Sequence, residues 1–307
     1  MARIVLVHGV AQQQRSADDL ENEWLPSLAG GIRTAGQPGL ADQLWPIQPT
    51  DRWARMAFYG HLFLTPDQQG DTANLTDAQR EIADEIALDW LTNALDSTRA
   101  RDAGTARQEL DALHHDPTDA QGIPGTTARA LAALDRIPWI GNAGFHLAAR
   151  HALIGQAVRY LTEPAIRRAA IASVHAHLDN DTRVVLAHSL GSVVTYEALH
   201  DRPQPLPLLI TIGSPLGLPS VIRRLQQPPT YPAGVHRWIN LADRDDIIAA
   251  RPHLTAIFDK ERPPTATFDS TYTVDNGAEP HRATFYLTKP TIGHAIAKAL
   301  HTDGSDH

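Results

Sequence analysis

The stretch from Arg183 to Leu199, RVVLAHSLGSVVTYEAL, constrains the fold more than any other part of the chain. A short apolar run from Val184 to Ala187 leads into His188-Ser189-Leu190-Gly191, and a helical pattern follows from Ser192 to Leu199. This order predicts a buried strand, a tight turn and a helix. A serine on such a turn exposes its hydroxyl above the carboxyl end of the sheet, which makes Ser189 a candidate nucleophile.

Small residues flank Ser189 at the two positions where a strand and a helix must approach closely. These positions hold Ala187 and Gly191, whereas the usual pattern, G-x-S-x-G, has glycine at both. The alternative interpretation is an ordinary strand-to-helix turn in which Ser189 caps the helix. The turn alone does not distinguish a nucleophilic serine from a capping serine. Features elsewhere in the chain are needed to choose between these interpretations.

Composition narrows the classes of partner. The 307 residues are 42% apolar, which is enough for one large α/β core, so we expect a single domain over residues 1–307. A net charge of -8 without any block of Lys and Arg argues against a nucleic-acid partner. The absence of cysteine excludes disulfides, thiolate metal sites and a cysteine nucleophile.

The first residues, MARIVLVHG, lack the features of a secretory signal, and we expect a cytoplasmic protein. No apolar run approaches the roughly 20 residues that a membrane-spanning helix needs. The sequence therefore predicts no integral membrane segment and leaves peripheral membrane contact open.

A second buried strand is predicted at Ile4 to Val7, a continuous apolar run that ends in His8-Gly9-Val10. A plain turn that ends the strand is the alternative interpretation of His8-Gly9. Residues 206–212 (LPLLITI) form a further buried strand that ends in Gly213-Ser214-Pro215.

The pattern changes between residues 65 and 162 to helices separated by polar breaks, and we expect a helical insertion there. Thr76 and Gln79 form a capping box, and a weaker helix covers Thr105 to Leu113. His114, His115 and Asp116 follow in what we expect to be a solvated loop. Adjacent histidines do not share one helix face and no third ligand accompanies them, so we predict no metal site. The apolar segment 137–145 is either a cap over the site or a buried connection.

Two clusters further on carry candidate acid and base groups. An apolar run after His236 ends in Asp243, Asp245 and Asp246, which in isolation would be solvated loop carboxylates. His281 lies in a loop between the last predicted strand, residues 265–274, and the last predicted helix, residues 291–300. His294 competes with it as the base but falls within the helical pattern.

Together these features resemble the serine esterases and lipases of the α/β-hydrolase superfamily, in which nucleophile, acid and base follow in the order Ser, Asp, His. The resemblance covers the core segments at both ends of the chain. It implies an α/β-hydrolase fold with a mostly parallel sheet, reduced because two edge strands that often precede the first one are missing, and with the insertion 65–162 as a cap.

The resemblance also implies roles for individual residues. Ser189 would be the nucleophile, His281 the general base and Asp246 the acid, since Asp246 stands two residues before the aliphatic Ile248. The N–H groups of Val10 and Leu190 would form the oxyanion hole. The supporting residues would be His8, Gly9, His188, Gly191 and Asp243, and Ser214 would border the acyl pocket.

The expected activity is hydrolysis of an acyl ester of a small molecule or lipid through a covalent acyl-enzyme, without a cofactor. Thioesters, phospholipids and peptides use the same constellation of groups. The alternative from another class is an inactive binding or scaffold module that retains the fold.

Overall fold

Six parallel strands form one open sheet in the computed structural model, which describes residues 2–45, 53–64, 75–115, 127–137, 147–249 and 254–301. The strands follow the order β2-β1-β3-β4-β5-β6 across the sheet. Their bounds are Ile4–Val7 (β1), Ala54–Ala57 (β2), Val184–His188 (β3), Leu208–Ile212 (β4), Arg237–Asp243 (β5) and Thr267–Val274 (β6).

β1 lies between β2 and β3, with Ile4 opposite both Ala54 and Val184. The chain therefore leaves β1 toward one edge of the sheet and later returns on the other side of β1 to form β3. Ligands of open α/β sheets bind beyond the carboxyl ends of the strands at such a reversal. The fold thus points to the ends of β1 and β3 as the place to look for a site.

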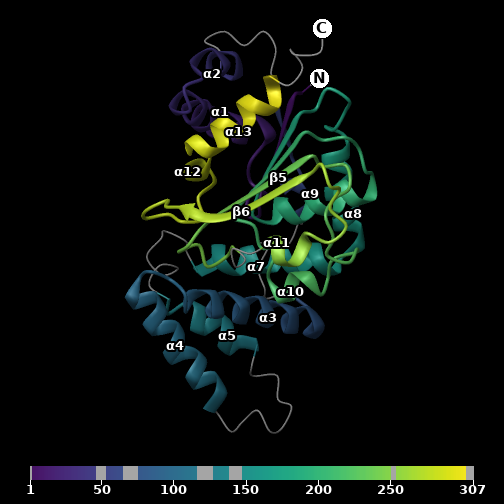
Figure 1. Cartoon of the computed structure of the whole chain (residues 1–307). Helices are drawn as coiled ribbons and strands as arrows, with labels where there is room; N and C mark the ends of the chain where they lie inside the picture. The colour runs from purple at the N-terminus through teal and green to yellow at the C-terminus, as the bar shows by residue number, and fades with distance from the viewer. Residues whose placement is uncertain are drawn as a thin grey trace.

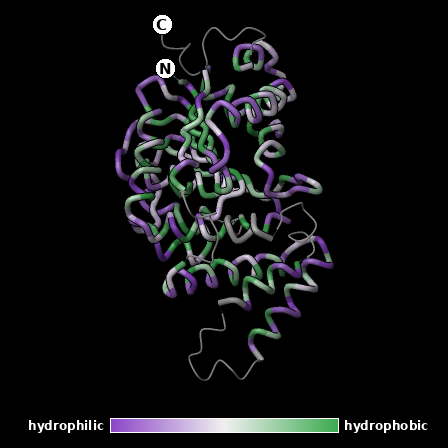
Figure 2. The backbone as a smooth tube through the Cα atoms, turned by 180° about the vertical axis from the view of Figure 1, so that it is seen from behind, coloured by the Kyte–Doolittle hydropathy of each residue, from purple (hydrophilic) through white to green (hydrophobic). Residues whose placement is uncertain are grey.

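Alternate residues of each strand point to opposite faces of the sheet, so each face needs its own cover. One face, which includes Leu6 and Leu186, packs against α1 (Ala17–Thr34), α2 (Pro38–Leu44), α12 (Ala283–Leu287) and α13 (Pro290–His301). These four helices lie together at one end of the molecule in Figure 1. Figure 2 shows hydrophobic residues concentrated along the strands between the helical layers.

The opposite face, which includes Val5 and Val185, packs in a second apolar cluster with the remaining helices. Two of these helices, α8 (Pro164–His175) and α9 (Leu190–Asp201), flank β3 in the sequence. The short helices α10 (Pro219–Ile222) and α11 (Leu254–Phe258) belong to the same cluster. A one-turn 3-10 helix, η1 (Gly60–Phe63), follows β2. Both faces are covered, which explains why the strand sequences are almost continuously apolar.

The region predicted to be a helical insertion contributes four described helices, α3 (Asp77–Ala94), α4 (Ala100–His115), α5 (Thr127–Leu134) and α7 (Leu147–Thr162). α3, α4 and α5 lie beside one another at the lower end of Figure 1. Thr76 and Gln79 form the predicted capping box at the start of α3. The apolar segment 137–145, expected to be a cap or a buried connection, lies almost wholly outside the described residues.

The mixed α/β class and the parallel sheet flanked by helices are therefore confirmed. One local prediction is wrong: His114 and His115 belong to α4 and not to a loop, because Leu110 and Leu113 pack against the core and extend the helix. Asp116 lies outside the described residues. Among the helices that the structure describes, none has the length and apolar character required to cross a bilayer.

Candidate active site

The turn between β3 and α9 holds Ser189 in a strained conformation. Its backbone angles are φ 53° and ψ -131°, a region that costs a non-glycine residue about 1–3 kcal/mol. The side chain makes no capping hydrogen bond to α9, so the interpretation of Ser189 as an ordinary helix cap is wrong. The strain instead leaves the hydroxyl free to point away from the helix.

The backbone approaches on both sides of Ser189 explain the small residues in the sequence pattern. A Cβ atom on Gly191 would lie 2.4 Å from the carbonyl oxygen of His8, and one on Gly9 would lie 2.6 Å from the Cβ atom of Ser189. Both distances are shorter than any stable contact. Ala187 is fully buried opposite Val7 and Thr211, where its methyl group is accommodated.

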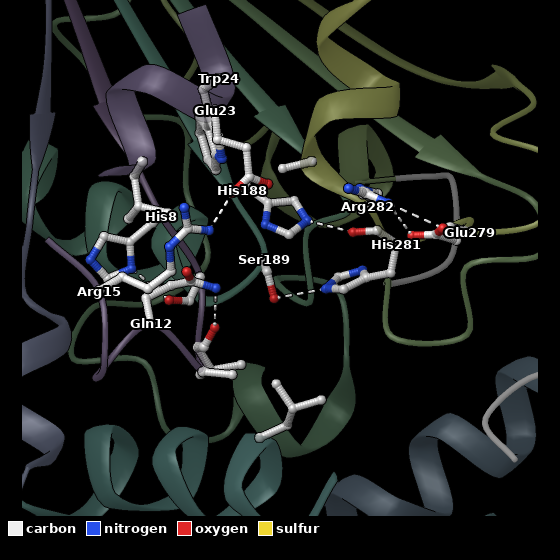
Figure 3. A pocket seen from close by; sticks show the side chains of 16 residues that line it. His8, Gln12, Arg15, Glu23, Trp24, His188, Ser189, Glu279, His281 and Arg282 are labelled. Atoms are coloured by element: carbon white, nitrogen blue, oxygen red, sulfur yellow. Dashed lines mark hydrogen bonds and ion pairs between the residues drawn. The ribbon is translucent and has the colours of Figure 1, made fainter. Parts of the chain in front are cut away.

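Ser189, His281 and Asp246 are far apart in the chain but form one hydrogen-bonded series. The Oγ atom of Ser189 lies 3.0 Å from Nε2 of His281, and Nδ1 of His281 lies 2.8 Å and 2.9 Å from the two carboxylate oxygens of Asp246. All three residues are buried. Figure 3 shows the hydroxyl of Ser189 and the ring of His281 pointing toward one another.

Asp246 is held as an anion in a buried setting. Its Oδ1 accepts the N–H groups of Ile248 and Ala249, and its Oδ2 accepts the hydroxyl of Tyr286 at 2.8 Å. Burial alone would raise the pKa of Asp246, but the positive charge of His281 and the hydrogen bonds from His281 and Tyr286 outweigh it and lower that pKa. The carboxylate can therefore orient the imidazole and stabilise its charged form.

The other two aspartates of the cluster, Asp243 and Asp245, form hydrogen bonds with other parts of the structure. Asp243 is buried, and its carboxylate accepts the N–H groups of Asp245 and Asn276, which braces the loop as expected from the sequence. Asp245 faces the helical region instead, where it accepts hydrogen bonds from the N–H and the hydroxyl of Thr98. Neither carboxylate is hydrogen-bonded to His281, so of the three only Asp246 has the geometry of the acid.

The peptide between Gly9 and Val10 is fixed by His8. Nδ1 of the buried His8 ring donates to the carbonyl oxygen of Gly9 at 2.7 Å, while Nε2 accepts the N–H of Tyr59 at 3.1 Å. Burial lowers the pKa of His8 to about 4, so the ring is neutral and has one N–H to donate. In a trans peptide the carbonyl and the following N–H point in opposite directions, so His8 also sets the direction of the Val10 N–H.

Val10 and Leu190 both lie beside Ser189 in the wall of a small cavity. Leu190 is the first residue of α9, so its N–H has no partner within the helix. Within the described part of the chain the N–H of Val10 donates to no protein acceptor, whereas that of the next residue, Ala11, donates to Gln156. The two residues that carry the predicted oxyanion donors therefore line the same small cavity.

His188, the residue before Ser189, holds the backbone of His281 in place. Its Nε2 donates to the backbone carbonyl oxygen of His281 at 2.8 Å, and its ring meets the edge of Trp24. Burial and the neighbouring charge of His281 lower the pKa of His188 to about 3, so this ring also stays neutral. Figure 3 places His188 between Trp24 and His281 above Ser189.

Several other candidates lie outside this arrangement. His294 is exposed on α13 and has no contact with Ser189. Ser214 hydrogen-bonds Ser192 at 2.6 Å and is absent from the walls of the two cavities beside Ser189, so it does not border them as expected. Among the residues described, no cluster of three or more His, Cys, Asp or Glu side chains is placed to hold a metal ion.

Tyr286 is the residue of this site that the sequence did not indicate. Its hydroxyl donates to the carboxylate of Asp246 and accepts the N–H of Asp243. Tyr286 therefore links the aspartate that braces the loop to the aspartate that faces His281. A single tyrosine in an apolar segment carries no pattern that distinguishes it from core packing.

Comparison of the chain with protein-family models, with curated proteins and with solved structures finds no match in any of the three. Assignment of an activity therefore depends on the geometry of the site.

Proposed function

We propose that the protein is a serine hydrolase of the α/β-hydrolase type that cleaves carboxylic esters through a covalent acyl-enzyme. The observation that supports this is the hydrogen-bonded series from Ser189 through His281 to Asp246, with the serine strained at the start of a helix. A merely structural serine has no need of a buried imidazole and carboxylate aligned behind it.

In the first half of the reaction, Oγ of Ser189 attacks the ester carbonyl carbon while Nε2 of His281 takes the hydroxyl proton. The N–H groups of Val10 and Leu190 stabilise the negative oxygen of the tetrahedral intermediate, and Asp246 stabilises the imidazolium. The bond to the alcohol oxygen then breaks, and His281 returns its proton to that oxygen. An alcohol leaves and an acyl-serine remains.

In the second half, water attacks the acyl-serine and gives its proton to His281. The carbon–oxygen bond to Ser189 breaks, the serine oxygen regains the proton from His281, and a carboxylic acid leaves. No electron donor or acceptor is needed, so the protein's own side chains carry out every step.

The test combines covalent labelling with turnover. A fluorophosphonate should label the wild-type protein at Ser189, and p-nitrophenyl acetate and butyrate should be hydrolysed. Ser189→Ala should lose labelling and at least about 10⁴-fold in kcat, with the melting temperature changed little. Ser173→Ala, on the outer helix α8, serves as the matched control and should behave as wild type.

Wild-type protein that neither labels nor turns over any ester would contradict this proposal. That result would favour an inactive module in which the fold is retained for binding. Labelling of Ser189 with turnover only of thioesters or peptides would retain the serine mechanism but reject the ester as substrate.

A further inference from the structure

Two cavities of different character meet at Ser189. The larger, about 210 Å³, extends past His188 toward Trp24, and the smaller, about 30 Å³, extends between α3, α7 and the segment after β4. Ser189 and His281 belong to the walls of both. An ester bound with its carbonyl carbon at Ser189 would therefore direct its two halves into different surroundings.

The smaller cavity is apolar. Apart from Ser189 and His281 its wall consists of apolar side chains, among them Ile86, Trp90, Ala157, Leu161, Leu218 and Val221. One water-sized group needs roughly 10–15 Å³ of such space, so the cavity holds about two or three of them. Val10 lines both cavities, but Leu190 lines only the smaller one, so this is the side on which the carbonyl oxygen and the acyl chain fit together.

Helix α3, which forms part of the wall of the small cavity, is held by hydrogen bonds and an ion pair to the segments that follow β4 and β5. Asn93 of α3 donates to the carbonyl oxygens of Ile247 and Ala249, next to Asp246, at 3.0 Å and 2.9 Å. Asp89 accepts the N–H of Ser220, and Glu85 forms an ion pair with Arg224 at 2.8 Å. These contacts along the length of α3 oppose any outward movement that would enlarge the cavity for a long chain.

The larger cavity combines apolar side chains with two ion pairs. Arg15 pairs with Glu23 and Arg282 with Glu279, and all four residues line the cavity, on opposite sides of Ser189 in Figure 3. Because each charge is paired, the wall has no strong excess of either sign. It suits an uncharged group that can form hydrogen bonds more than an ion.

His188 adds a defined hydrogen-bond acceptor to this wall. Its Nε2 carries the ring proton, because the partner of Nε2 is the carbonyl oxygen of His281. The neutral ring then has a lone pair on Nδ1, and the only hydrogen bond that the ring forms among the described residues is the one from Nε2. A hydroxyl on the alcohol half of an ester could donate to it.

Building on the function proposed above, we infer that the substrates are esters that join a short, unbranched acyl chain of about two to four carbons to a hydroxyl-bearing, uncharged alcohol such as a polyol. The chain occupies the small cavity under α3 and α7. The alcohol occupies the larger cavity against His188.

The acyl half is tested with p-nitrophenyl esters from acetate to laurate, in which only the chain varies. The kcat/KM of the wild type should be highest at two to four carbons and at least roughly tenfold lower at eight. Ala157→Leu, which fills the cavity, should retain acetate and lose butyrate. Leu161→Ala, which enlarges it, should move the optimum to longer chains.

Leu91→Ala is the matched control for Leu161→Ala. It removes the same group from the same apolar cluster, but Leu91 does not line the cavity, so the chain-length profile should stay as in wild type. Thermal unfolding of both variants shows whether they are folded at the assay temperature. An optimum at eight carbons or more in the wild type, or identical profiles for the two variants, would overturn the inference.

The alcohol half is tested at constant acyl chain by comparing glycerol monobutyrate with n-butyl butyrate. One hydrogen bond predicts a kcat/KM about threefold to tenfold higher for the glycerol ester. In His188→Phe, which keeps a ring against Trp24, this ratio should fall to about one whatever the loss in absolute rate. A ratio of one or less in the wild type, or an unchanged ratio in the variant, would overturn the assignment.

The two proposals fail in distinguishable ways. A protein that neither labels with a fluorophosphonate nor hydrolyses any ester overturns both. A protein that labels at Ser189 but prefers long chains or plain alcohols overturns only the substrate class.

Discussion

The hydroxyl of Tyr286 donates to Oδ2 of Asp246 at 2.8 Å and accepts the N–H of Asp243 at the same distance. One side chain from α12 therefore sets the position of the carboxylate that faces His281. Tyr286 touches neither Ser189 nor the cavities, so we treat it as a positioning residue.

Tyr286→Phe should lower kcat about tenfold or more, because a hydrogen bond to a charged group is lost. It also removes one of the contacts that lower the pKa of Asp246, so that pKa should rise. More of the carboxyl is then protonated in acid, and the loss of activity should be larger at pH 5 than at pH 8. The pH profile of kcat/KM measures this. Tyr231→Phe, whose hydroxyl binds Thr267 away from the site, is the control.

His281→Ala should abolish ester hydrolysis while His294→Ala leaves it unchanged, because only the first ring reaches Ser189. The loss should approach that of Ser189→Ala, since the members of such a unit act together. Steady-state kinetics with p-nitrophenyl butyrate measures both variants. Essential His294 with dispensable His281 would mean that the base has been assigned wrongly.

Asp246→Asn should lower kcat by about 10⁴-fold, because the amide favours the wrong tautomer of His281. Asp245→Asn is the matched comparison within the same loop. Its carboxylate holds Thr98 and not the imidazole, so this variant should lose stability and keep most of its activity. If the two variants had equal kcat, the carboxylate that serves His281 would have to be another one.

His8→Phe should lower kcat by about 10²-fold with little change in KM, since the peptide that carries the Val10 N–H is no longer held. His8→Asn keeps a side-chain N–H near Gly9 and should recover at least about tenfold of that loss. The exposed His61, changed to Phe, is the control. Equal kcat in both His8 variants would indicate that the ring only fills space.

Asp84 on α3 predicts an unusual pH dependence of stability. Burial raises its pKa to about 6, against a hydrogen bond from the Ala130 backbone that lowers it, and its Oδ1 has no partner within the described structure. The folded state therefore binds this proton more tightly than the unfolded state does. The contribution of Asp84 to the free energy of unfolding is highest below about pH 4 and is lost as the pH rises to about 6.

Asp84→Asn should accordingly raise the free energy of unfolding at pH 8, by on the order of 1 kcal/mol after allowance for solvent screening. At pH 4.5 the gain should be smaller. Urea unfolding followed by circular dichroism at the two pH values measures the difference. Asp96→Asn, on an exposed residue beyond the end of α3, should show no such dependence.

The sequence predicted those parts of the site that local chemistry specifies. The turn at Ser189 follows from the apolar run before it and the small residue at Gly191, which must pass the carbonyl of His8. The carboxylate of Asp246 accepts the N–H of Ile248, two residues later. Because this hydrogen bond is local, the spacing of the two residues in the sequence indicates it. Whether these groups catalyse ester hydrolysis stays a prediction.

Contacts between segments that are far apart in the chain could not be predicted from local sequence patterns. The small cavity arises where α3, α7 and the segment after β4 converge, and no residue of any one segment indicates it. Tyr286 reaches Asp246 across 40 positions of the chain. The end of α4 at His115 was missed because tertiary packing of Leu113 extended a helix of weak intrinsic pattern.

The place of β1 in the sheet has a consequence for how the protein folds during synthesis. Both neighbours of β1 come later in the chain, and its pairing with β3 joins Ile4 to Val184. A ribosome must therefore release some 180 further residues before that strand finds its second partner, and until then its apolar edge is open to other chains. Assistance from a chaperone early in translation would benefit this topology more than one in which neighbouring strands are consecutive.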